Sequence, residues 1–259
     1  MIAGQTVVVV MPAYNAETTI EKTWQEVMAQ EIVDLVIVVD DRSHDATVER
    51  ARKLPNVIVH EHPKNVGYGG NQKTCYRLAL ENGADIVIMV HPDYQYTPKL
   101  IPAMAGLVAS DLYQCVLGSR ILGGGAIKGR MPWWRYVANR VLTAADNILI
   151  GCKLSEFHTG YRAFSRELLL KLPLDANSDD FVFDNQMLAQ TIWMGFEIGE
   201  VSCPTRYATD ASSINFRRSV QYGFGCLWTA MLYRLCKWNM ARSPLFPVKA
   251  ADREHVPAS

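Results

Sequence analysis

The sequence has no excess of charge of either sign and no apolar run that reads as a clear bilayer span. Its 26 lysines and arginines balance 26 aspartates and glutamates, so the formal net charge is +0. A strongly basic protein attracts nucleic acid over much of its surface, and that general attraction is missing here. Nucleic acid is therefore not an expected partner, and any attraction to anions must be local.

The chain also lacks paired cysteines, internal repeats and low-complexity segments. Its six cysteines lie far apart, with no CxxC pair and no spacing typical of a metal site. Scattered thiols in an apolar domain are typical of reduced core residues, so we expect a cytoplasmic protein. Residues 1–6 carry no basic segment, and the apolar run after them is short, so we expect a first strand there and not a signal peptide.

Apolar residues make up 49% of the 259 residues, and in the first half of the chain they alternate between strand-like and helix-like patterns. Buried strands are expected at 7–11, 35–39, 57–60 and 86–90, with helices between them at 17–30, 46–54 and 71–81. Short connections between such elements indicate right-handed βαβ crossovers. The predicted fold class is α/β, with a Rossmann-like, doubly wound, mostly parallel sheet that carries helices on both faces.

The second half of the chain is less regular. We expect helices at 100–107, 133–150, 166–171 and 184–194, strands at 116–120 and 196–203, and loops at 123–129, 157–164 and 179–184. Residues 1–215 are expected to form one domain, residues 216–240 an amphipathic helix, and residues 241–259 a loosely ordered tail.

The most informative stretch is the end of the fourth expected strand. Five apolar residues, Ile86 to Val90, run directly into His91, Asp93 and Gln95. If the backbone stays extended, these three polar side chains point to the same side. A carboxylate and an amide at the end of a buried strand suit a hard divalent cation and the phosphates attached to it. The alternative is a capped strand end with solvated polar residues.

Other polar residues follow the first and second expected strands. Asn15 comes after the first strand, and Asp40 and Asp41 end the second. Ligands of doubly wound sheets bind at the carboxyl ends of the strands, so these residues should lie near Asp93. The sequence therefore predicts a binding site at this edge of the sheet.

Six motifs follow one another along the chain: Pro12-Ala-Tyr-Asn15, the Asp40-Asp41 stretch with Ser43, Asp45 and Thr47, His91-x-Asp93-x-Gln95, Gly118-Ser-Arg120 with the glycine-rich loop after it, Thr159-Gly-Tyr-Arg162, and Gly199-Glu-Val201. In this order they resemble the motifs of the family 2 glycosyltransferases with the GT-A fold. The last three resemble most the polyprenyl-phosphate sugar transferases of the dolichyl-phosphate mannose type. The similarity runs from about residue 5 to about residue 225.

This resemblance implies a nucleotide-sugar donor, and carboxylates at strand ends suit the base and ribose because charge-assisted hydrogen bonds are strong. The residues expected at the nucleotide are Pro12, Tyr14, Asn15, Glu17, Asp40, Asp41, Gly67 and Lys73. For Asp45 we favour a turn or helix-cap role. The glycine cluster near Gly67 is not interpreted as a phosphate cradle.

The resemblance also implies a divalent metal, Mn²⁺ or Mg²⁺, held by Asp93 and Gln95. The family usually has an aspartate where this chain has His91. An imidazole suits manganese or cobalt better than magnesium, so we predict a preference for the softer metals. The alternative is that His91 only forms a nearby hydrogen bond.

On the acceptor side, the resemblance implies a phosphate seat made of Arg120, Arg135 and Asn139. Arg135 and Asn139 lie four residues apart on an expected helix and so share a face, and guanidinium groups can bind phosphate oxygens bidentately. The alternative is surface salt bridging. Arg206, Arg217 and Arg218 stand near, but not at, the positions of further basic residues of the family.

A phosphate acceptor is already an anion and needs no general base, so Asp93 with the metal and Arg120 would be enough for an inverting displacement. A hydroxyl acceptor needs a base, for which Asp184 is the first candidate and Asp180 the second. A helix-cap role is the alternative for both aspartates.

Residues 217–238 combine aromatic and basic residues, as does Trp133-Trp134 beside Lys128 and Arg130. Such a helix can lie in a membrane interface as a peripheral contact, at the cytoplasmic face, or it can pack on the domain or in a homo-oligomer. The family's appended transmembrane helices are not matched.

Three hypotheses follow from the sequence. The leading one is an inverting glycosyltransferase that moves a sugar from a UDP- or GDP-sugar to a dolichyl or undecaprenyl type of polyprenyl phosphate. The second is transfer to a hydroxyl of a saccharide or other small acceptor. The third is a catalytically weak nucleotide-sugar-binding protein. The base, the sugar and the lipid stay open.

Overall fold

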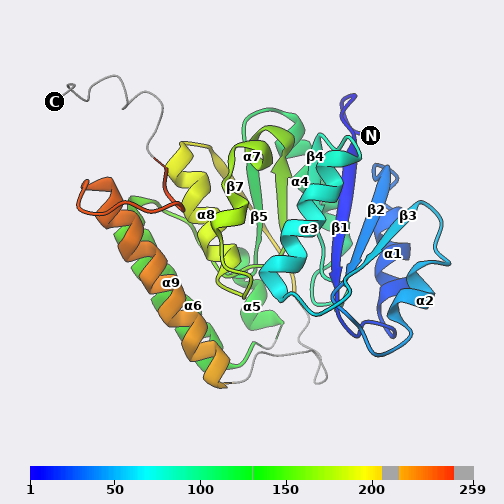
Figure 1. Ribbon diagram of the computed structural model, residues 1–259, viewed down its shortest axis with the longest axis horizontal. Coiled ribbons are helices and arrows are strands. Elements are labelled where there is room, and N and C mark those ends of the chain that lie inside the picture. The colour runs from blue at the N-terminus through cyan, green and yellow to red at the C-terminus, as the bar shows by residue number, and fades with distance from the viewer. Residues whose placement is uncertain (130, 206–215, 248–259) are drawn as a thin grey trace.

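A computed structural model describes residues 1–129, 131–205 and 216–247 of the chain. Within these residues a seven-stranded sheet has the order β3-β2-β1-β4-β6-β5-β7 (Figure 1). The strands are β1 (Val7–Ala13), β2 (Leu35–Asp40), β3 (Val57–Glu61), β4 (Ile86–Met89), β5 (Cys115–Ser119), β6 (Arg162–Ser165) and β7 (Ile198–Ser202). All pairs are parallel except those that β6 forms with β4 and β5.

Strands β1 and β4 are apolar along their whole length because both faces of the sheet are covered. Val9 of β1 pairs with Val36 of β2 on one side and with Ile88 of β4 on the other. All three side chains are fully buried. Continuous β-branched runs of this kind are typical of parallel strands between two helical layers, and the prediction of buried strands here is confirmed.

The helices are α1 (Ile20–Met28), α2 (Thr47–Ala51), α3 (Tyr68–Glu81), α4 (Ile101–Ala109), α5 (Gly125–Lys128), α6 (Trp133–Asp146), α7 (Arg166–Lys171), α8 (Phe183–Met194) and α9 (Phe216–Lys237). Single helical turns cover Pro98–Leu100, Leu122–Gly124 and Leu174–Ala176, and a π-helical turn, Asn147–Gly151, follows α6. One buried cluster joins the sheet to α1 and α4, and a second joins its other face to α3, α7, α8 and α9. Helices on both faces confirm the predicted fold class.

The expected loop at 157–164 is partly wrong, because its end forms β6. This strand has only four residues and includes the charged Arg162, so no alternating pattern marks it in the sequence. It runs antiparallel between β4 and β5, with Met89 and Leu117 both opposite Arg162. An arginine can occupy this fully buried position because backbone carbonyls and a carboxylate receive its donors, as described below.

The end of β4 also differs from expectation. The strand stops at Met89, and the backbone then turns, with Tyr94 in the left-handed region at a φ of 61°. Asp93 Oδ1 accepts a hydrogen bond from the backbone N–H of Gln95 at 3.0 Å, which holds the turn. The extended backbone assumed for His91, Asp93 and Gln95 is therefore wrong, although all three still line one cavity.

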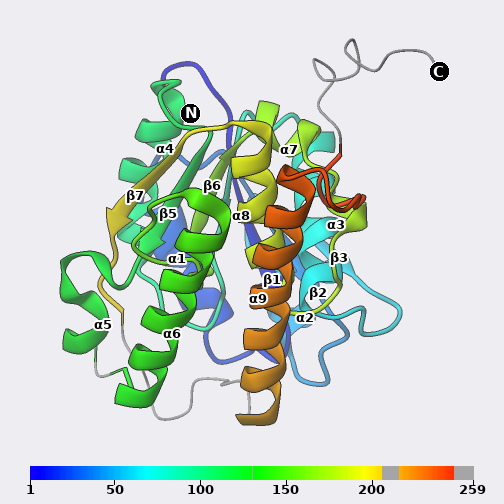
Figure 2. The same cartoon turned by 90° about the vertical axis from the view of Figure 1, so that its left-hand side faces the viewer.

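Helices α6 and α9 lie side by side and project beyond the carboxyl ends of the strands (Figures 1 and 2). Helix α9 also packs on α8 and on the π-helical turn. After α9, Phe246 is buried against Trp193 and Tyr233, and Trp193 Nε1 donates to the carbonyl of Pro247 at 2.8 Å. The expected loose tail is therefore wrong up to residue 247, and residues 248–259 lie outside the described residues.

Over the described parts of the chain, none of the helices is both long enough and apolar enough for a membrane span.

Candidate active site

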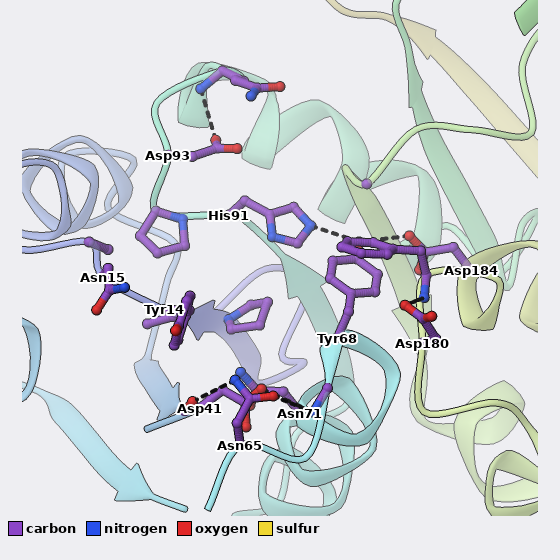
Figure 3. Close-up of a pocket in the computed structure, with 18 of the residues that line it drawn as sticks. Tyr14, Asn15, Asp41, Asn65, Tyr68, Asn71, His91, Asp93, Asp180 and Asp184 are labelled. Carbon is purple, nitrogen blue, oxygen red and sulfur yellow. Dashed lines mark hydrogen bonds between the residues drawn. The ribbon is translucent and has the colours of Figure 1, made fainter. Parts of the chain in front are cut away.

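A cavity of about 1230 Å³ opens at the carboxyl ends of β1, β2 and β4. The loop at 178–181, which carries Asp180 (Figure 3), and the first turns of α9 complete its wall. The residues expected from the sequence that line it are Pro12, Tyr14, Asn15, Asp41, Gly67, His91, Asp93, Gln95, Asp180, Asp184 and Arg218. The prediction that the polar residues after β1, β2 and β4 meet at one edge of the sheet agrees with this arrangement.

The adjacent aspartates at the end of β2 differ in position. Asp40 is buried, accepts from the Ser43 backbone N–H at 2.8 Å and from the Ser43 hydroxyl, and does not line the cavity. Asp41 lines the cavity and accepts from the N–H groups of Val66 at 2.7 Å and Gly67 at 3.1 Å. The structure therefore gives Asp40 a turn-forming position and leaves Asp41 as the aspartate at the cavity.

Asn15 and Glu17 hold the segment between β2 and α2. The Asn15 side-chain carbonyl accepts from the His44 N–H at 2.9 Å, and the Glu17 carboxylate accepts from the Ala46 N–H at 3.0 Å. Asp45 accepts from the Thr47 N–H at 3.0 Å, which agrees with the cap role favoured for it. Glu17 does not line the cavity, so its expected contact with the nucleotide has no geometric support.

Gly67 and Lys73 connect α3 to the opposite wall of the cavity. Gly67 has a φ of 87°, and a Cβ there would lie 2.6 Å from the backbone oxygen of Asp179. Lys73 Nζ donates to the Asn177 carbonyl at 2.6 Å and to Asp179 Oδ1 at 2.8 Å. The ammonium of Lys73 therefore ties down the 177–179 loop, and it does not line the cavity as expected for a nucleotide-binding residue.

Asn71, on the first turn of α3, was not expected at the site. Its side-chain N–H donates to the Val39 carbonyl at 3.0 Å, while Oδ1 is buried and has no hydrogen-bond partner in the described parts of the chain. The residue is only 3% exposed and lines the cavity. Buried polar atoms are rarely left unpaired, so Oδ1 is a ready acceptor for an N–H group of a ligand.

Tyr68 joins two of the predicted residues. Its hydroxyl donates to Asp184 Oδ2 at 2.8 Å and lies 3.1 Å from Nε2 of His91, and its ring stacks on the imidazole (Figure 3). Burial and the neighbouring Asp184 raise the pKa of Tyr68 well above its ordinary value, so the hydroxyl keeps its proton. The sequence offered no signal for this residue beyond a tyrosine at a helix start.

Asp184 is occupied by three partners. Besides Tyr68, Gln72 Nε2 donates to its Oδ1 at 3.1 Å, and Arg162 Nη1 lies 3.7 Å from the same oxygen. Arg162 is fully buried and also donates to the carbonyls of Phe157, Thr159 and Asp184. Burial would lower the pKa of Arg162, but the neighbouring Asp184 raises it above its ordinary value, so the guanidinium keeps its charge.

The predicted phosphate seat is not assembled at the cavity. Arg120 Nε donates to Glu156 Oε1 at 2.8 Å, its Nη2 forms an ion pair with the same carboxylate, and Nη2 also donates to the His158 carbonyl at 2.6 Å. Asn139 Nδ2 donates to Glu156 Oε1 at 2.8 Å. Glu156 is fully buried, and sequence reasoning missed it. Arg120 and Asn139 are therefore close together, as predicted, but around a protein carboxylate, and neither lines the cavity.

Arg135 lies with its guanidinium 5.0 Å from the Trp134 ring and does not line the cavity. The cationic residue that does line it is Arg218, at the start of α9. Beside Arg218, the Tyr222 hydroxyl forms a hydrogen bond with His158 Nδ1 at 2.8 Å, and His158 Nε2 is buried with no partner among the residues that the structure describes. Arg130, Arg206 and the side chain of Arg217 lie outside the described residues.

The charges of the cavity are unbalanced. Its described lining contains five carboxylates, from Asp41, Asp93, Asp179, Asp180 and Asp184, and one arginine, Arg218. The described residues contain no group of three or more His, Cys, Asp or Glu side chains placed to hold a metal ion. Asp93, Gln95 and His91 instead offer a mixed, incomplete donor set, which suits a cation that takes its remaining ligands from substrate phosphates.

Comparison with known proteins gives two kinds of match. The sequence profile of the family described as Glycosyl transferase family 2 matches residues 8–172. A UDP-N-acetylglucosamine–dolichyl-phosphate N-acetylglucosaminyltransferase of Methanococcus voltae is 27% identical, over 91% of this chain and 99% of that protein. An undecaprenyl-phosphate mannosyltransferase of Micrococcus luteus is 29% identical, over 75% of this chain and 81% of that protein.

Among solved structures, glucosyl-3-phosphoglycerate synthase of Mycobacterium tuberculosis, in complex with Mn²⁺, UDP and glucosyl-3-phosphoglycerate, has a similar fold. The TM-score is 0.69 at 23% identity, and the match covers 93% of this chain and 82% of that one. The same enzyme has also been crystallised with Mg²⁺ and UDP. This likeness supports the GT-A fold expected from the sequence.

Proposed function

The chain belongs to glycosyl transferase family 2 and is a glycosyltransferase, and from this premise we propose that it moves a sugar from a nucleotide-sugar donor to a polyprenyl phosphate. The matched relatives from Methanococcus voltae and Micrococcus luteus have names that specify dolichyl and undecaprenyl phosphate as acceptors. The observation that carries the proposal is that Tyr68, Gln72 and Arg162 already contact the carboxylate of Asp184. Asp184 is the first candidate for a general base, and a phosphate acceptor needs no such base.

The donor is proposed to be a UDP- or GDP-sugar held at the ends of β1 and β2. Asp41 and the unpaired Oδ1 of Asn71 present acceptors for N–H groups of the base, and Tyr14 offers an exposed ring beside them. Hydrogen bonds to a carboxylate are charge-assisted and therefore strong. Pro12 and Asn15 complete this part of the wall.

A divalent cation, Mn²⁺ or Mg²⁺, would be held by Asp93 and Gln95, with His91 beside them. The excess of carboxylates in the cavity would repel a diphosphate, and a bound cation supplies the positive charge that offsets this repulsion and the charge of the departing nucleoside diphosphate. Crystals of the structurally similar synthase contain UDP with Mn²⁺ or with Mg²⁺.

The acceptor oxygen is proposed to be that of a phosphomonoester. Such an oxygen is already an anion at neutral pH, since its second pKa is about 6. It attacks the anomeric carbon of the sugar, the bond from that carbon to the diphosphate oxygen breaks, and the electron pair leaves with the nucleoside diphosphate. One displacement of this kind inverts the anomeric centre and requires no proton transfer to the protein.

The acceptor phosphate would meet the cavity at Arg218 and His158. Both line the cavity, and the buried Nε2 of His158 has no partner within the described residues. Arg120 lies directly behind, since its guanidinium donates to the His158 carbonyl. This proposal moves the phosphate contact from the Arg120, Arg135 and Asn139 set, predicted from the sequence, to the end of α9.

A lipid acceptor also requires access to a membrane surface, for which α6 and α9 are suited. Trp133 is 78% exposed and Trp228 is 64% exposed, and further exposed apolar side chains share these helices, namely Val137, Val141, Val220, Phe224 and Met231. Arg234 and Lys237 stand near the end of α9. Exposed aromatic residues with flanking basic groups fit a helix pair that lies in the membrane interface.

A hydroxyl acceptor is the alternative, and Asp180 is the observation that favours it. Asp180 lines the cavity, and within the described residues its Oδ1 accepts a single local hydrogen bond, from the Phe181 backbone N–H at 2.8 Å. A base at this position could take the proton of a sugar hydroxyl.

Acceptor exchange separates the two reactions. The protein is incubated with labelled UDP- and GDP-sugars and Mn²⁺, with undecaprenyl phosphate or with undecaprenol, and the label is extracted into organic solvent. We expect extractable label with the phosphate and none with the alcohol. Label on undecaprenol, or on a water-soluble saccharide only, would overturn the phosphate assignment.

A further inference from the structure

We propose that Tyr68 is a positioning residue that fixes His91 in one tautomer, with the proton on Nε2, so that Nδ1 is the atom left to bind the divalent cation. This inference rests on the proposed function, because it concerns the metal of the same site. It answers a question raised by the sequence, namely how an imidazole can stand where the family usually has a carboxylate.

Asp184, Tyr68 and His91 form a chain of hydrogen bonds in which each hydrogen atom can be assigned. Asp184 lies 3.7 Å from the buried Arg162, and its two carboxylate oxygens accept hydrogen bonds from Gln72 and Tyr68. The Tyr68 hydroxyl has one hydrogen, which it donates to Asp184 Oδ2 at 2.8 Å. At its second contact, 3.1 Å from Nε2 of His91, the Tyr68 oxygen must therefore accept, and Nε2 must carry a proton.

Gly160 and Tyr68 also restrict access to the His91 ring. A Cβ on Gly160 would lie 2.7 Å from His91 Nε2 and 2.9 Å from its Cδ2, so that edge of the ring is pressed against backbone. The Tyr68 ring stacks on the imidazole, with 5.5 Å between the centroids and 18° between the planes. Nε2 is thus closed off by Tyr68 and Gly160, and a cation can approach His91 only from its other nitrogen.

Tyr68 is itself held in place by its neighbours. Phe181 packs on its ring with 4.8 Å between the centroids, and Gln72 binds the second oxygen of Asp184. In Figure 3 His91 lies between Tyr68 on one side and the part of the cavity near Asp93 and Tyr14 on the other. The order Asp184, Tyr68, His91 resembles the carboxylate–histidine pairs that orient metal ligands in proteins, with a phenol inserted between the two groups.

Nuclear magnetic resonance of ¹⁵N-histidine-labelled protein tests the tautomer without any metal or substrate. We expect His91 of the wild-type protein to carry its proton on Nε2, and Tyr68→Phe to shift the ring toward a mixture of tautomers. Tyr76→Phe is the matched control, because it removes a hydroxyl from the same helix that contacts Gln72 and Met89 but not His91. Protonation of wild-type His91 on Nδ1 would overturn the proposal.

Binding of Mn²⁺ in the presence of UDP, and separately of GDP, measured by electron paramagnetic resonance, tests the consequence. Loss of a residue that orients a metal ligand typically costs 10- to 100-fold in metal affinity, and we expect roughly that loss for Tyr68→Phe. In a His91→Asp background the same Tyr68→Phe change should cost less than about twofold, because a carboxylate needs no tautomer.

An equal loss of Mn²⁺ affinity in both backgrounds, or no loss in either, contradicts the role assigned to Tyr68. Failure of the proposed function is a different result. In that case no variant transfers sugar to undecaprenyl phosphate, while the tautomer and the Mn²⁺ measurements still respond to Tyr68→Phe.

Discussion

Neighbouring residues of the same type occupy different positions at this site, and Asp40 and Asp41 are the clearest example. Asp40 closes a turn with Ser43, whereas Asp41 holds the N–H groups of Val66 and Gly67 at the edge of the cavity. The sequence places both at the end of one strand. Only the backbone geometry after the strand decides which carboxylate faces the ligand.

We expect Asp41→Asn to weaken binding of UDP and GDP, measured calorimetrically with Mn²⁺, by roughly tenfold or more. The substitution removes charge-assisted hydrogen bonds, each worth about 1.5–3 kcal/mol, and about 1.4 kcal/mol corresponds to tenfold in affinity. Asp40→Asn is the control, and it should lower stability toward urea while changing nucleotide affinity less than about twofold. Similar losses of nucleotide affinity in both variants would show that Asp41 does not bind the nucleotide.

The buried pair of Arg120 and Glu156 predicts a dependence of stability on pH. Burial would raise the pKa of Glu156, but the charge of Arg120 and its hydrogen bonds hold that pKa below the ordinary value of 4.5. The pair therefore stabilises the fold above pH 4.5, and this contribution is lost as the pH falls through the lower pKa of the folded state.

We expect Glu156→Gln to lower the free energy of unfolding at pH 7 by roughly 3–5 kcal/mol, because Arg120 is left buried without its counter-charge. Urea titrations should show the difference from the wild type shrinking below pH 4.5. Glu167→Gln breaks an exposed pair with Lys171 and should cost within about 0.5 kcal/mol. A difference for Glu156→Gln that does not change between pH 7 and pH 3 would refute the assigned charge state.

At the scale of elements, the sequence predicts what depends on long apolar patterns and misses what depends on single buried charges. Strands β1 and β4, and β2 up to Val39, are uninterrupted apolar runs, so the sequence pattern predicts them. Strand β6 is missed because its only distinctive residue, Arg162, is charged, and its burial depends on carbonyls from distant segments.

The residues of the candidate active site also divide into those that the sequence predicts and those that it misses. The residues after β1, β2 and β4 are brought to one cavity as expected, because parallel strands share an edge. Tyr68 and Glu156 are missed because their partners, Asp184 and Arg120, lie 116 and 36 residues away in the sequence. No local pattern reports such a pairing, and Arg120 is displaced from its expected role for this reason.

The exposed apolar side chains of α6 and α9 predict binding to lipid vesicles. We expect a variant that combines Phe224→Ser with Trp228→Ser to bind anionic vesicles roughly tenfold more weakly in co-sedimentation, since burying each such side chain contributes up to about 1.5–3 kcal/mol. Leu170→Ser, at an exposed position of α7, is the control and should bind like the wild type. If the wild-type protein does not bind vesicles but forms a dimer, and the double variant is a monomer, this surface instead contacts a second copy of the chain.

At the scale of the whole molecule, zero net charge conceals a strongly acidic cavity. Five carboxylates face it with one arginine among the described lining residues, so an anionic donor is repelled unless a cation enters as well. Lys73 pairs with Asp179 at 2.8 Å and Arg162 pairs with Asp184 at 3.7 Å, so the remaining excess over Arg218 comes from Asp41, Asp93 and Asp180.

We therefore expect a chelator to abolish binding of UDP and GDP, and Mn²⁺ to restore binding and sugar transfer several-fold better than Mg²⁺. The preference follows from the imidazole of His91, and His91→Asp should shift it toward Mg²⁺. Initial rates in parallel titrations of the two metals provide the measurement. Better activity of the wild-type protein with Mg²⁺ than with Mn²⁺ would show that His91 does not set the choice of metal.

The contacts of the first turn of α3 restrict how the cavity can move when substrates bind. The N–H groups of Gly69 and Gly70 donate to the Asp179 carbonyl, and Lys73 binds both Asn177 and Asp179. Hydrogen bonds thus join the start of α3, beside the proposed donor site, to the 177–179 loop on the opposite side of the cavity. We expect the start of α3 and the 177–179 loop to move together as one rigid unit, so that the distance between them stays fixed when substrates bind.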